Sequence, residues 1–159
     1  MERRQLSATR APERIVLCVD MGDEMNDEWA ISPEAPMQSR QSAVQNALKT
    51  FVRRKLSFRP GPRGHKFAVV GFADEAEWRL NFTDNLEQIF QAIDGLTARR
   101  GCEPTFDFSR LFEALEDRLG LGSEAAIPAA SPGRTRTLNI RLLTRVIVVF
   151  GRSIAAPKL

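Results

Sequence analysis

The fold is decided by the stretch Glu13-Arg14-Ile15-Val16-Leu17-Cys18-Val19-Asp20. Its central residues, 15–19, are all apolar and rich in β-branched types, and they lack the polar gaps of an amphipathic helix. A short run of this kind predicts a strand that is buried on both faces, in the middle of a parallel sheet. Open α/β sheets bind ligands in the crevice at the carboxyl ends of their strands. Asp20, which ends the run, is therefore the residue around which a functional site is expected.

Length and composition restrict the class of protein. The chain has 159 residues, of which 43% are hydrophobic and 27% charged, as expected for one globular domain of ordinary size. No apolar run approaches the roughly 20 residues of a membrane-spanning helix, and the N-terminus lacks the apolar segment of a secretory signal. Cys18 and Cys102 do not form a metal-ligand pattern, so a reducing compartment is expected. The net charge of +3 does not by itself indicate nucleic acid.

Periodicity along the rest of the chain predicts two kinds of element. Alternating or continuous apolar runs predict further strands at 67–73, 76–82 and 146–150, the last of them buried like the first. Helical spacing of apolar residues predicts helices over 42–56, 84–96 and 108–119. Ser42 with Gln45 has the spacing of a capping box, and Thr83 or Asp84 is expected to cap the second helix. Residues 21–38 are expected to form a loop over the sheet, and 122–136 a surface linker.

This order of elements predicts the topology. The short turn at Asp74 and Glu75 requires an antiparallel hairpin, whereas the other strands need crossover helices and are parallel. The expected fold is α/β, a doubly wound, mostly parallel sheet with strand order 3-2-1-4 and strand 3 antiparallel. Residues 1–12 and 152–159 are expected to be tails around a domain at 13–151. If the fold stops after the fourth strand, that strand has an apolar edge open to further sequence or another subunit.

Over residues 13–151, the pattern resembles a von Willebrand factor A domain, roughly the first two-thirds of that fold. Such domains hold a divalent metal with an Asp-x-Ser-x-Ser motif after strand 1, a Thr from a later loop and an Asp after strand 4. Here the motif reads Asp20-Met21-Gly22-Asp23-Glu24, and Thr105 can take the place of the Thr from the later loop. After the fourth strand the chain reads Phe150-Gly151-Arg152-Ser153, with no carboxylate.

The resemblance implies a metal site that has degenerated. Asp20, Glu24 and Thr105 can offer oxygen ligands, but a hard cation takes about six, and a nearby Arg152 would oppose it. Asp20, Asp23 and Glu24 are thus metal-ligand candidates, and the alternative is an acidic solvated loop in which Asp20 accepts hydrogen bonds from backbone amides. The oxygen count favours the alternative. No metal, cofactor or catalytic residue is therefore expected.

Within that superfamily, several pieces in their joint order are similar to the scaffold subunit of the BRISC and breast-cancer-associated A deubiquitinase complexes. These pieces are the opening stretch with Glu24-Met25, residues 47–55, 65–70 and 78–84, and Arg145-Val146-Ile147-Val148-Val149-Phe150-Gly151-Arg152-Ser153. The resemblance implies a non-catalytic subunit of complexes that cleave non-degradative ubiquitin chains, in the DNA-damage response and mitosis. It implies protein partners in the nucleus and cytoplasm, and no membrane, nucleic acid or small-molecule substrate.

A basic segment, the one histidine and a tryptophan are further candidates for function. A basic segment could contact phosphates or an acidic protein, but a solvated helix face and loop is the preferred interpretation. Its members are Lys49, Arg53, Arg54, Lys55, Arg59, Arg63 and Lys66. His65, the one histidine, is expected at the surface, and Trp78 is expected to pack in the core. Neither GxGxxG nor GxxxxGK[ST] occurs.

Three alternatives to the scaffold function stay open. The first is a divalent-metal-dependent ligand-binding A domain, based on Asp20 and Thr105. The second is another intracellular A domain, such as the ubiquitin receptor of the proteasome. The third is a nucleic-acid binder, for which binding should depend steeply on salt.

Overall fold

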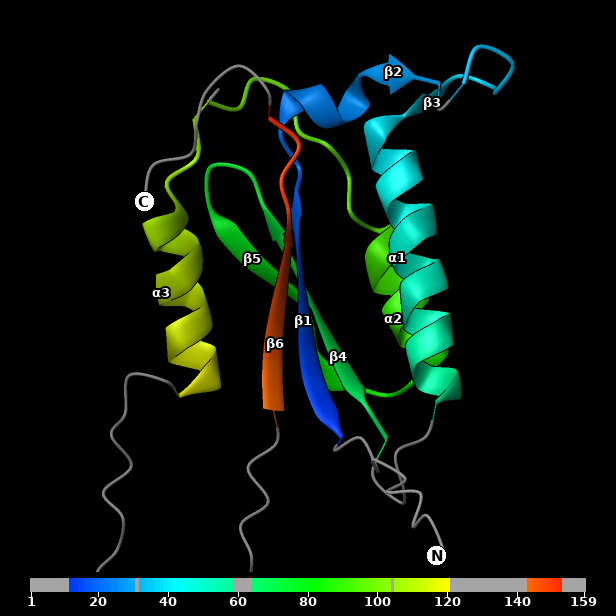
Figure 1. Ribbon diagram of the computed structural model, residues 1–159. Coiled ribbons are helices and arrows are strands. Elements are labelled where there is room, and N and C mark those ends of the chain that lie inside the picture. Colours follow the sequence, from blue (N-terminus) through cyan, green and yellow to red (C-terminus); the bar gives the residue numbers. More distant parts are fainter. Residues whose placement is uncertain (1–11, 31, 59–63, 104, 121–142, 153–159) are drawn as a thin grey trace, which may run out of the picture.

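The computed structural model describes residues 12–30, 32–58, 64–103, 105–120 and 143–152 (Figure 1). The main sheet contains β1 (Glu13–Asp20), β4 (Lys66–Phe72), β5 (Ala76–Thr83) and β6 (Leu143–Val149). The α-helices of the described part of the chain are α1 (Arg40–Ser57), α2 (Leu86–Asp94) and α3 (Phe108–Leu119). The expected tails other than Pro12 and Arg152, together with the linker 122–136, lie outside the described residues, so those expectations stay untested. Arg152, which was assigned to the second tail, is buried, because it pairs with Asp20.

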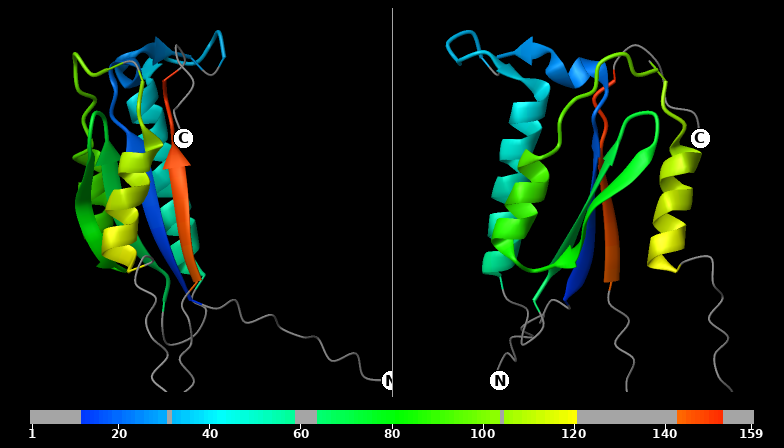
Figure 2. Two further views of the ribbon diagram at one scale, coloured as in Figure 1. Left: turned by 90° about the vertical axis from the view of Figure 1, so that its left-hand side faces the viewer. Right: turned by 180° about the vertical axis from the view of Figure 1, so that it is seen from behind.

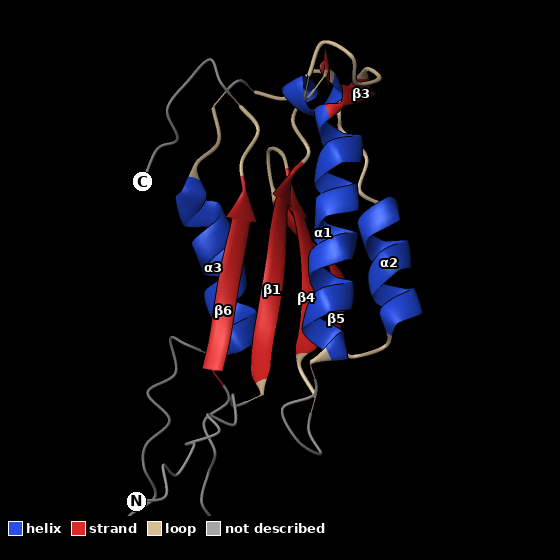
Figure 3. Ribbon diagram, turned by 45° about the vertical axis from the view of Figure 1, so that its right-hand side comes forward, coloured by secondary structure: helices blue, strands red, loops and turns tan. Residues whose placement is uncertain are grey.

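The sheet has the order β5-β4-β1-β6, which confirms the predicted order 3-2-1-4 (Figure 3). β1 is parallel to both of its neighbours, with Leu17 opposite Val69 on one side and Ile147 on the other. β4 and β5 pair antiparallel, as the short turn between them requires. The fold class predicted from the sequence, a doubly wound and mostly parallel α/β sheet, is therefore confirmed.

Helices cover the two faces of the sheet unequally. α1 and α2 lie on one face and α3 lies on the other (Figures 1 and 2). Alternate residues of β1 supply two cores, because successive side chains of a strand point to opposite faces. Ile15, Leu17 and Val19 pack with Val52 of α1 and Ile89 and Ile93 of α2. Val16 and Cys18 pack with Leu111 and Leu115 of α3. This double burial explains why the run 15–19 is apolar without alternation.

Two helix starts differ from the sequence prediction. α1 begins at Arg40, because Ser39 is its N-cap and the Ser39 hydroxyl accepts from the Ser42 amide at 3.1 Å. Gln45 does not close a capping box. Its side-chain amide instead donates to the carbonyls of Ile93 and Leu96, both at 3.0 Å, and so ties α1 to the end of α2.

The cap of α2 is Asn85 rather than Thr83 or Asp84. The Asn85 side chain accepts from the Glu87 and Gln88 amides, as an N-cap side chain does for the first free amides of a helix. Two members of the predicted apolar stripes are also exposed, since Leu86 is 37% and Phe112 is 47% accessible.

Residues 21–38 are more ordered than the loop that was predicted. They contain a 3-10 helix η1 (Asp23–Asn26) and a small antiparallel pair, β2 (Glu28–Trp29) with β3 (Gln38–Ser39). Met21 and Met25 are 2% and 1% exposed, so the segment is anchored to the core above the carboxyl end of β1.

The prediction that the last strand is buried is wrong. β6 is the edge strand of the sheet, and Val146 and Val148 are 40% and 38% exposed. Within the described residues β6 pairs only with β1. The apolar open edge expected for a sheet that stops at the fourth strand is thus present in this part of the chain.

Candidate functional site at the carboxyl edge of the sheet

Asp20 lies at the carboxyl end of the central strand and is 1% exposed. Its Oδ1 accepts a hydrogen bond from the Gly22 amide at 2.9 Å, and its Oδ2 accepts one from the Gly151 amide at 3.2 Å. These amides belong to the segments that follow β1 and β6, which meet here because the two strands are parallel neighbours. The expectation that Asp20 accepts from backbone amides is confirmed.

Arg152 provides the positive charge opposite Asp20. Its Nε lies 3.3 Å from both carboxylate oxygens of Asp20, and the two side chains are 3% and 0% exposed. Its Nη1 donates to the carbonyl of Glu103 and its Nη2 to the carbonyl of Ala73, both at 2.6 Å. The guanidinium also lies 5.5 Å from the ring centre of Phe106, at cation–π distance. All three nitrogens of the side chain are therefore used.

This one side chain joins four segments of the carboxyl edge. They are the end of β1, the turn between β4 and β5, the loop before α3, and the residues after β6. Guanidinium has planar donors in a fixed fork and stays protonated, so it suits a buried site that offers several oxygens. A buried pair of this kind is stable only when its remaining polar groups have partners, and here each guanidinium nitrogen and each Asp20 oxygen has at least one.

Gly22 leaves the space that Arg152 fills. A Cβ added at Gly22 would lie 2.9 Å from the Arg152 Nε and 3.2 Å from the Asp20 Oδ1. The first of these distances is too short for an ordinary contact. Gly22 stands where the resembling metal motif has its first serine, so a serine there is incompatible with the observed position of Arg152.

The other predicted ligands do not converge on Asp20. Glu24 forms an ion pair with Arg40, its Oε2 lying 3.3 Å from Nη1, and that same nitrogen donates to the Gly151 carbonyl at 2.9 Å. Asp23 uses its Oδ2 to accept from the Gly101 amide at 2.9 Å. Both carboxylates therefore stabilise loops.

The residues present do not fit a divalent cation. A hard cation must approach carboxylate oxygens to about 2.0–2.6 Å, and the Arg152 Nε already lies against both oxygens of Asp20. Within the described residues, no group of three or more His, Cys, Asp or Glu side chains is arranged as a metal site. The carboxyl edge is accordingly held by an internal ion pair.

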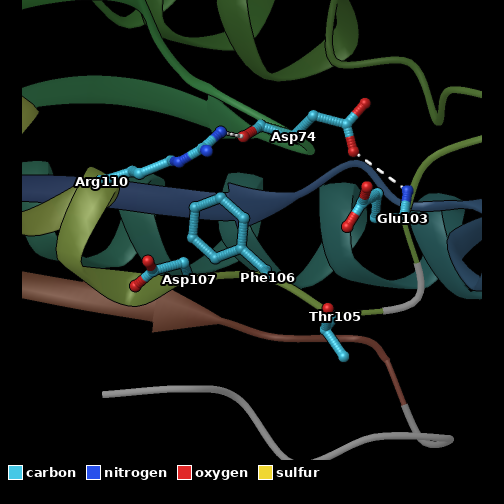
Figure 4. Close-up of a pocket in the computed structure, with 6 residues that line it drawn as sticks. All are labelled: Asp74, Glu103, Thr105, Phe106, Asp107 and Arg110. Carbon is cyan, nitrogen blue, oxygen red and sulfur yellow. Dashed lines mark hydrogen bonds between the residues drawn. The ribbon is translucent and has the colours of Figure 1, made fainter.

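Beside Arg152 lies a pocket of about 380 Å³ (Figure 4). Its lining residues are Asp74, Glu103, Thr105, Phe106, Asp107 and Arg110. Three of its polar groups have structural partners. Asp74 accepts from the Glu103 amide at 3.0 Å, Arg110 donates to the Asp74 carbonyl at 3.1 Å, and Asp107 caps α3 through the Ser109 amide. Thr105, the third predicted ligand, lines this pocket.

The prediction that His65 is a surface residue is wrong. It is 2% exposed, and its Nδ1 accepts from the Glu13 amide at 3.2 Å. Sequence reasoning also missed Glu13, which is 7% exposed. The Glu13 Oε2 lies 2.9 Å from the Lys55 ammonium and 3.4 Å from the Arg145 Nε. Both contacts are ion pairs with a nearly buried carboxylate. Burial raises the pKa of Glu13, but Lys55, Arg145 and His65 together bring it below its ordinary value.

The basic segment is a helix face with several internal partners. Lys49 lies 2.7 Å from the Asp94 carboxylate, and Arg53 lies 5.3 Å from the ring centre of Phe90. Arg59 and Arg63 lie outside the described residues. Trp78 packs against the α3 core as predicted, and its Nε1 donates to the Ala114 carbonyl at 3.2 Å.

The sheet order, the helices on both faces and the loops that meet at Asp20 define an A-type domain. The chain belongs to the von Willebrand factor type A domain family, whose model matches residues 15–123, more than half of the chain. Among curated proteins, no sequence matches this chain.

Two solved structures show the same fold. An uncharacterized membrane-spanning protein from Vibrio fischeri is 16% identical with a TM-score of 0.53, over 70% of this chain and 52% of that one. The three N-terminal domains of the type V pili tip protein Mfa5 from Porphyromonas gingivalis are 18% identical with a TM-score of 0.54, over 87% of this chain and 19% of that one. The chain thus spans about half of the first structure and a fifth of the second. At these identities the likeness shows the fold alone.

Within the described residues, no helix combines the length and the apolar character needed to cross a bilayer.

Proposed function

We propose that this A domain is a non-catalytic scaffold or adaptor subunit of a deubiquitinase complex that acts on non-degradative ubiquitin chains. The processes proposed for it are the DNA-damage response and mitosis, in the nucleus and cytoplasm. Its partners are the protein subunits of that complex, and it has no membrane, nucleic-acid or small-molecule ligand. The observation that carries the proposal is the Asp20–Arg152 pair, which occupies the place where a metal-dependent A domain binds its ion.

Two side chains that could serve as a base or a nucleophile, those of His65 and Cys18, are buried, which supports a non-enzymatic function. The one histidine, His65, is buried, and its Nδ1 is used by a backbone amide. Cys18 is fully buried, and burial raises the pKa of its thiol to about 12, so it stays protonated at neutral pH. Neither residue is available to a substrate in this arrangement.

The segments that carry the resemblance to the scaffold subunit have structural positions that support it. The opening stretch is the central strand, and residues 47–55 lie in α1. The last segment supplies edge strand β6 and Arg152, so two distant pieces of the resemblance meet in one ion pair. An open apolar edge strand is a template for pairing with another chain, as expected for a protein that is bound by other proteins.

Affinity purification tests the proposal. The tagged full chain is expressed in cells of its source organism and recovered in parallel with an unrelated tagged A domain. The expected result is enrichment of a deubiquitinase with its associated subunits, together with cleavage of non-degradative ubiquitin chains by the eluate. Recovery of proteasome particles instead would favour a ubiquitin receptor and overturn the proposal. Recovery of neither assembly would also count against it.

A further inference from the structure

We propose that Arg152 is a tethered cation that takes the place of a divalent ion at the carboxyl edge and that Gly22 is the residue that makes room for it. The loops of this face are then held together by the chain itself. The way in which these loops are held together does not depend on which protein binds to this face.

The guanidinium of Arg152 occupies the space that a cation would need. The Arg152 Nε lies 3.3 Å from each carboxylate oxygen of Asp20, and both side chains are almost fully buried. A cation bound at ordinary carboxylate distances would lie in the volume that this guanidinium occupies. Since guanidinium is charged at every physiological pH, the position opposite Asp20 is filled under all such conditions.

The contacts of Arg152 replace those of a coordinated metal. A metal ion in such a place would join oxygens from separate loops. Here Arg152 does this with its own nitrogens, because Nη1 binds the Glu103 carbonyl and Nη2 binds the Ala73 carbonyl. The aromatic ring of Phe106 covers the guanidinium at 5.5 Å. One fixed side chain therefore determines how the three loops around Asp20 are positioned.

Gly22 lies directly against the Arg152 side chain. Only a residue without Cβ avoids the Arg152 Nε, since an added Cβ would lie 2.9 Å from it. Gly22 does not need a left-handed backbone here, because its φ is −68°. The reason for glycine at this position is therefore the space taken by Arg152.

A double-mutant cycle tests that pairing by thermal unfolding of Gly22→Ala, Arg152→Ala and the double variant. In the native background, Gly22→Ala is expected to lower the Tm by roughly 5 °C or more, because the new Cβ displaces the ion pair. In the Arg152→Ala background, the same change is expected to cost less than half of that shift. An equal shift in both backgrounds would overturn the inference. If Arg152→Ala does not fold, the whole cycle is run in the Asp20→Asn background, which removes the buried charge that Arg152→Ala would leave unpaired.

A titration with divalent cations tests the exclusion directly. The native chain is stripped with EDTA and then given Mg²⁺, Ca²⁺ or Mn²⁺ at millimolar concentration, with calorimetry and thermal unfolding as readouts. The expected result is no saturable heat and a Tm unchanged within about 1 °C. Asp20→Asn is the control that identifies the site. Saturable binding to the native chain that Asp20→Asn abolishes would show that a metal displaces Arg152 and would overturn the inference.

Discussion

The Nδ1 of His65 accepts a hydrogen bond from the backbone N–H of Glu13 at 3.2 Å, across the amino end of the sheet. The Glu13 carboxylate in turn lies 2.9 Å from Lys55 of α1 and 3.4 Å from Arg145 of β6. This polar cluster connects two strands and a helix at the end of the sheet opposite to Asp20. Both ends of the central strand are thus anchored by buried polar groups, with the apolar run between them.

Replacing His65 by leucine tests the first of these contacts. His65→Leu keeps an apolar side chain of moderate size but leaves the Glu13 amide without that acceptor. We expect a loss of about 1–3 kcal/mol in the free energy of unfolding, the penalty of an unsatisfied buried donor. The exposed neighbour Lys66 gives the control, because Lys66→Ala should change stability by less than about 0.5 kcal/mol. Equal urea midpoints for native chain and His65→Leu would contradict this assignment.

The lowered pKa of Glu13 predicts a pH-dependent contribution to stability. A carboxyl whose pKa is lower in the folded chain stabilises it above the unfolded value, here 4.5, and loses that effect as the pH falls through the folded value. Glu13→Gln should therefore cost about 1–3 kcal/mol at pH 7, between the values for exposed and buried pairs. The difference from the native chain should shrink below pH 4.5. Urea unfolding from pH 3 to 7 measures this difference in the free energy of unfolding. Glu113→Gln, on the exposed side of α3, is the control. A difference that stays constant with pH would rule out the ionised carboxylate as its source.

The two thiols are expected to react at very different rates. Cys18 is fully buried, with a pKa raised to about 12, so a thiol reagent should reach it only when the chain unfolds. Cys102 is partly exposed, and burial together with Asp74 and Asp23 raises its pKa, so it should react slowly in the native state and faster as the pH rises. Labelling followed by mass spectrometry distinguishes the sites. In Cys102→Ser, the remaining reaction should follow the unfolding rate, and fast native labelling of Cys18 would contradict its burial.

The end of α3 predicts a difference between two glycines. Gly120 ends the helix with φ at 65°, in the left-handed region, so Gly120→Ala should cost roughly 1 kcal/mol of stability. Gly64 has no heavy atom within 4 Å of an added Cβ and is not in that region. Gly64→Ala should therefore be neutral or slightly stabilising. Thermal unfolding of both variants checks the contrast, and equal costs would exclude backbone conformation as the cause.

The open edge predicts self-association that a charge can suppress. Val148 is 38% exposed on β6, and an apolar edge strand is a template for pairing with another chain. Val148→Lys should cost less than about 1 kcal/mol, because the lysine stem can lie on the sheet with its ammonium in water. Sedimentation is expected to show association of the native chain that increases with concentration, and Val148→Lys should reduce it. Val16→Lys, at a fully buried position of β1, should prevent folding. Association that is the same in native and Val148→Lys chains would exclude this edge.

The sheet could be predicted because its order follows from local patterns. In the run Ile15 to Val19, the side chains that point to one face of the sheet and those that point to the other are all apolar. The structure buries both sets. The run Val146 to Phe150 is also entirely apolar, but β6 lies at the edge of the sheet. Apolar content shows what a strand is able to bury, and it does not show whether a neighbouring element is present to cover it.

The site was predictable only in part, for a similar reason. The sequence indicated that Asp20 would accept from amides and that Arg152 would be near it, since both follow parallel strands. The contacts of Arg152 with the carbonyls of Ala73 and Glu103 could not be predicted from the sequence, because every residue has a backbone carbonyl and none of them is marked as a partner. His65 was missed because its partner is a backbone amide 52 residues away.

The two members of the Asp20–Arg152 pair are 132 positions apart in the chain. On the ribosome, which makes a protein from its N-terminus, the counter-charge therefore emerges long after the carboxylate. Until then the growing polypeptide carries an acidic group that is unfavourable to bury alone. The loops around it can therefore close only when translation has passed residue 152.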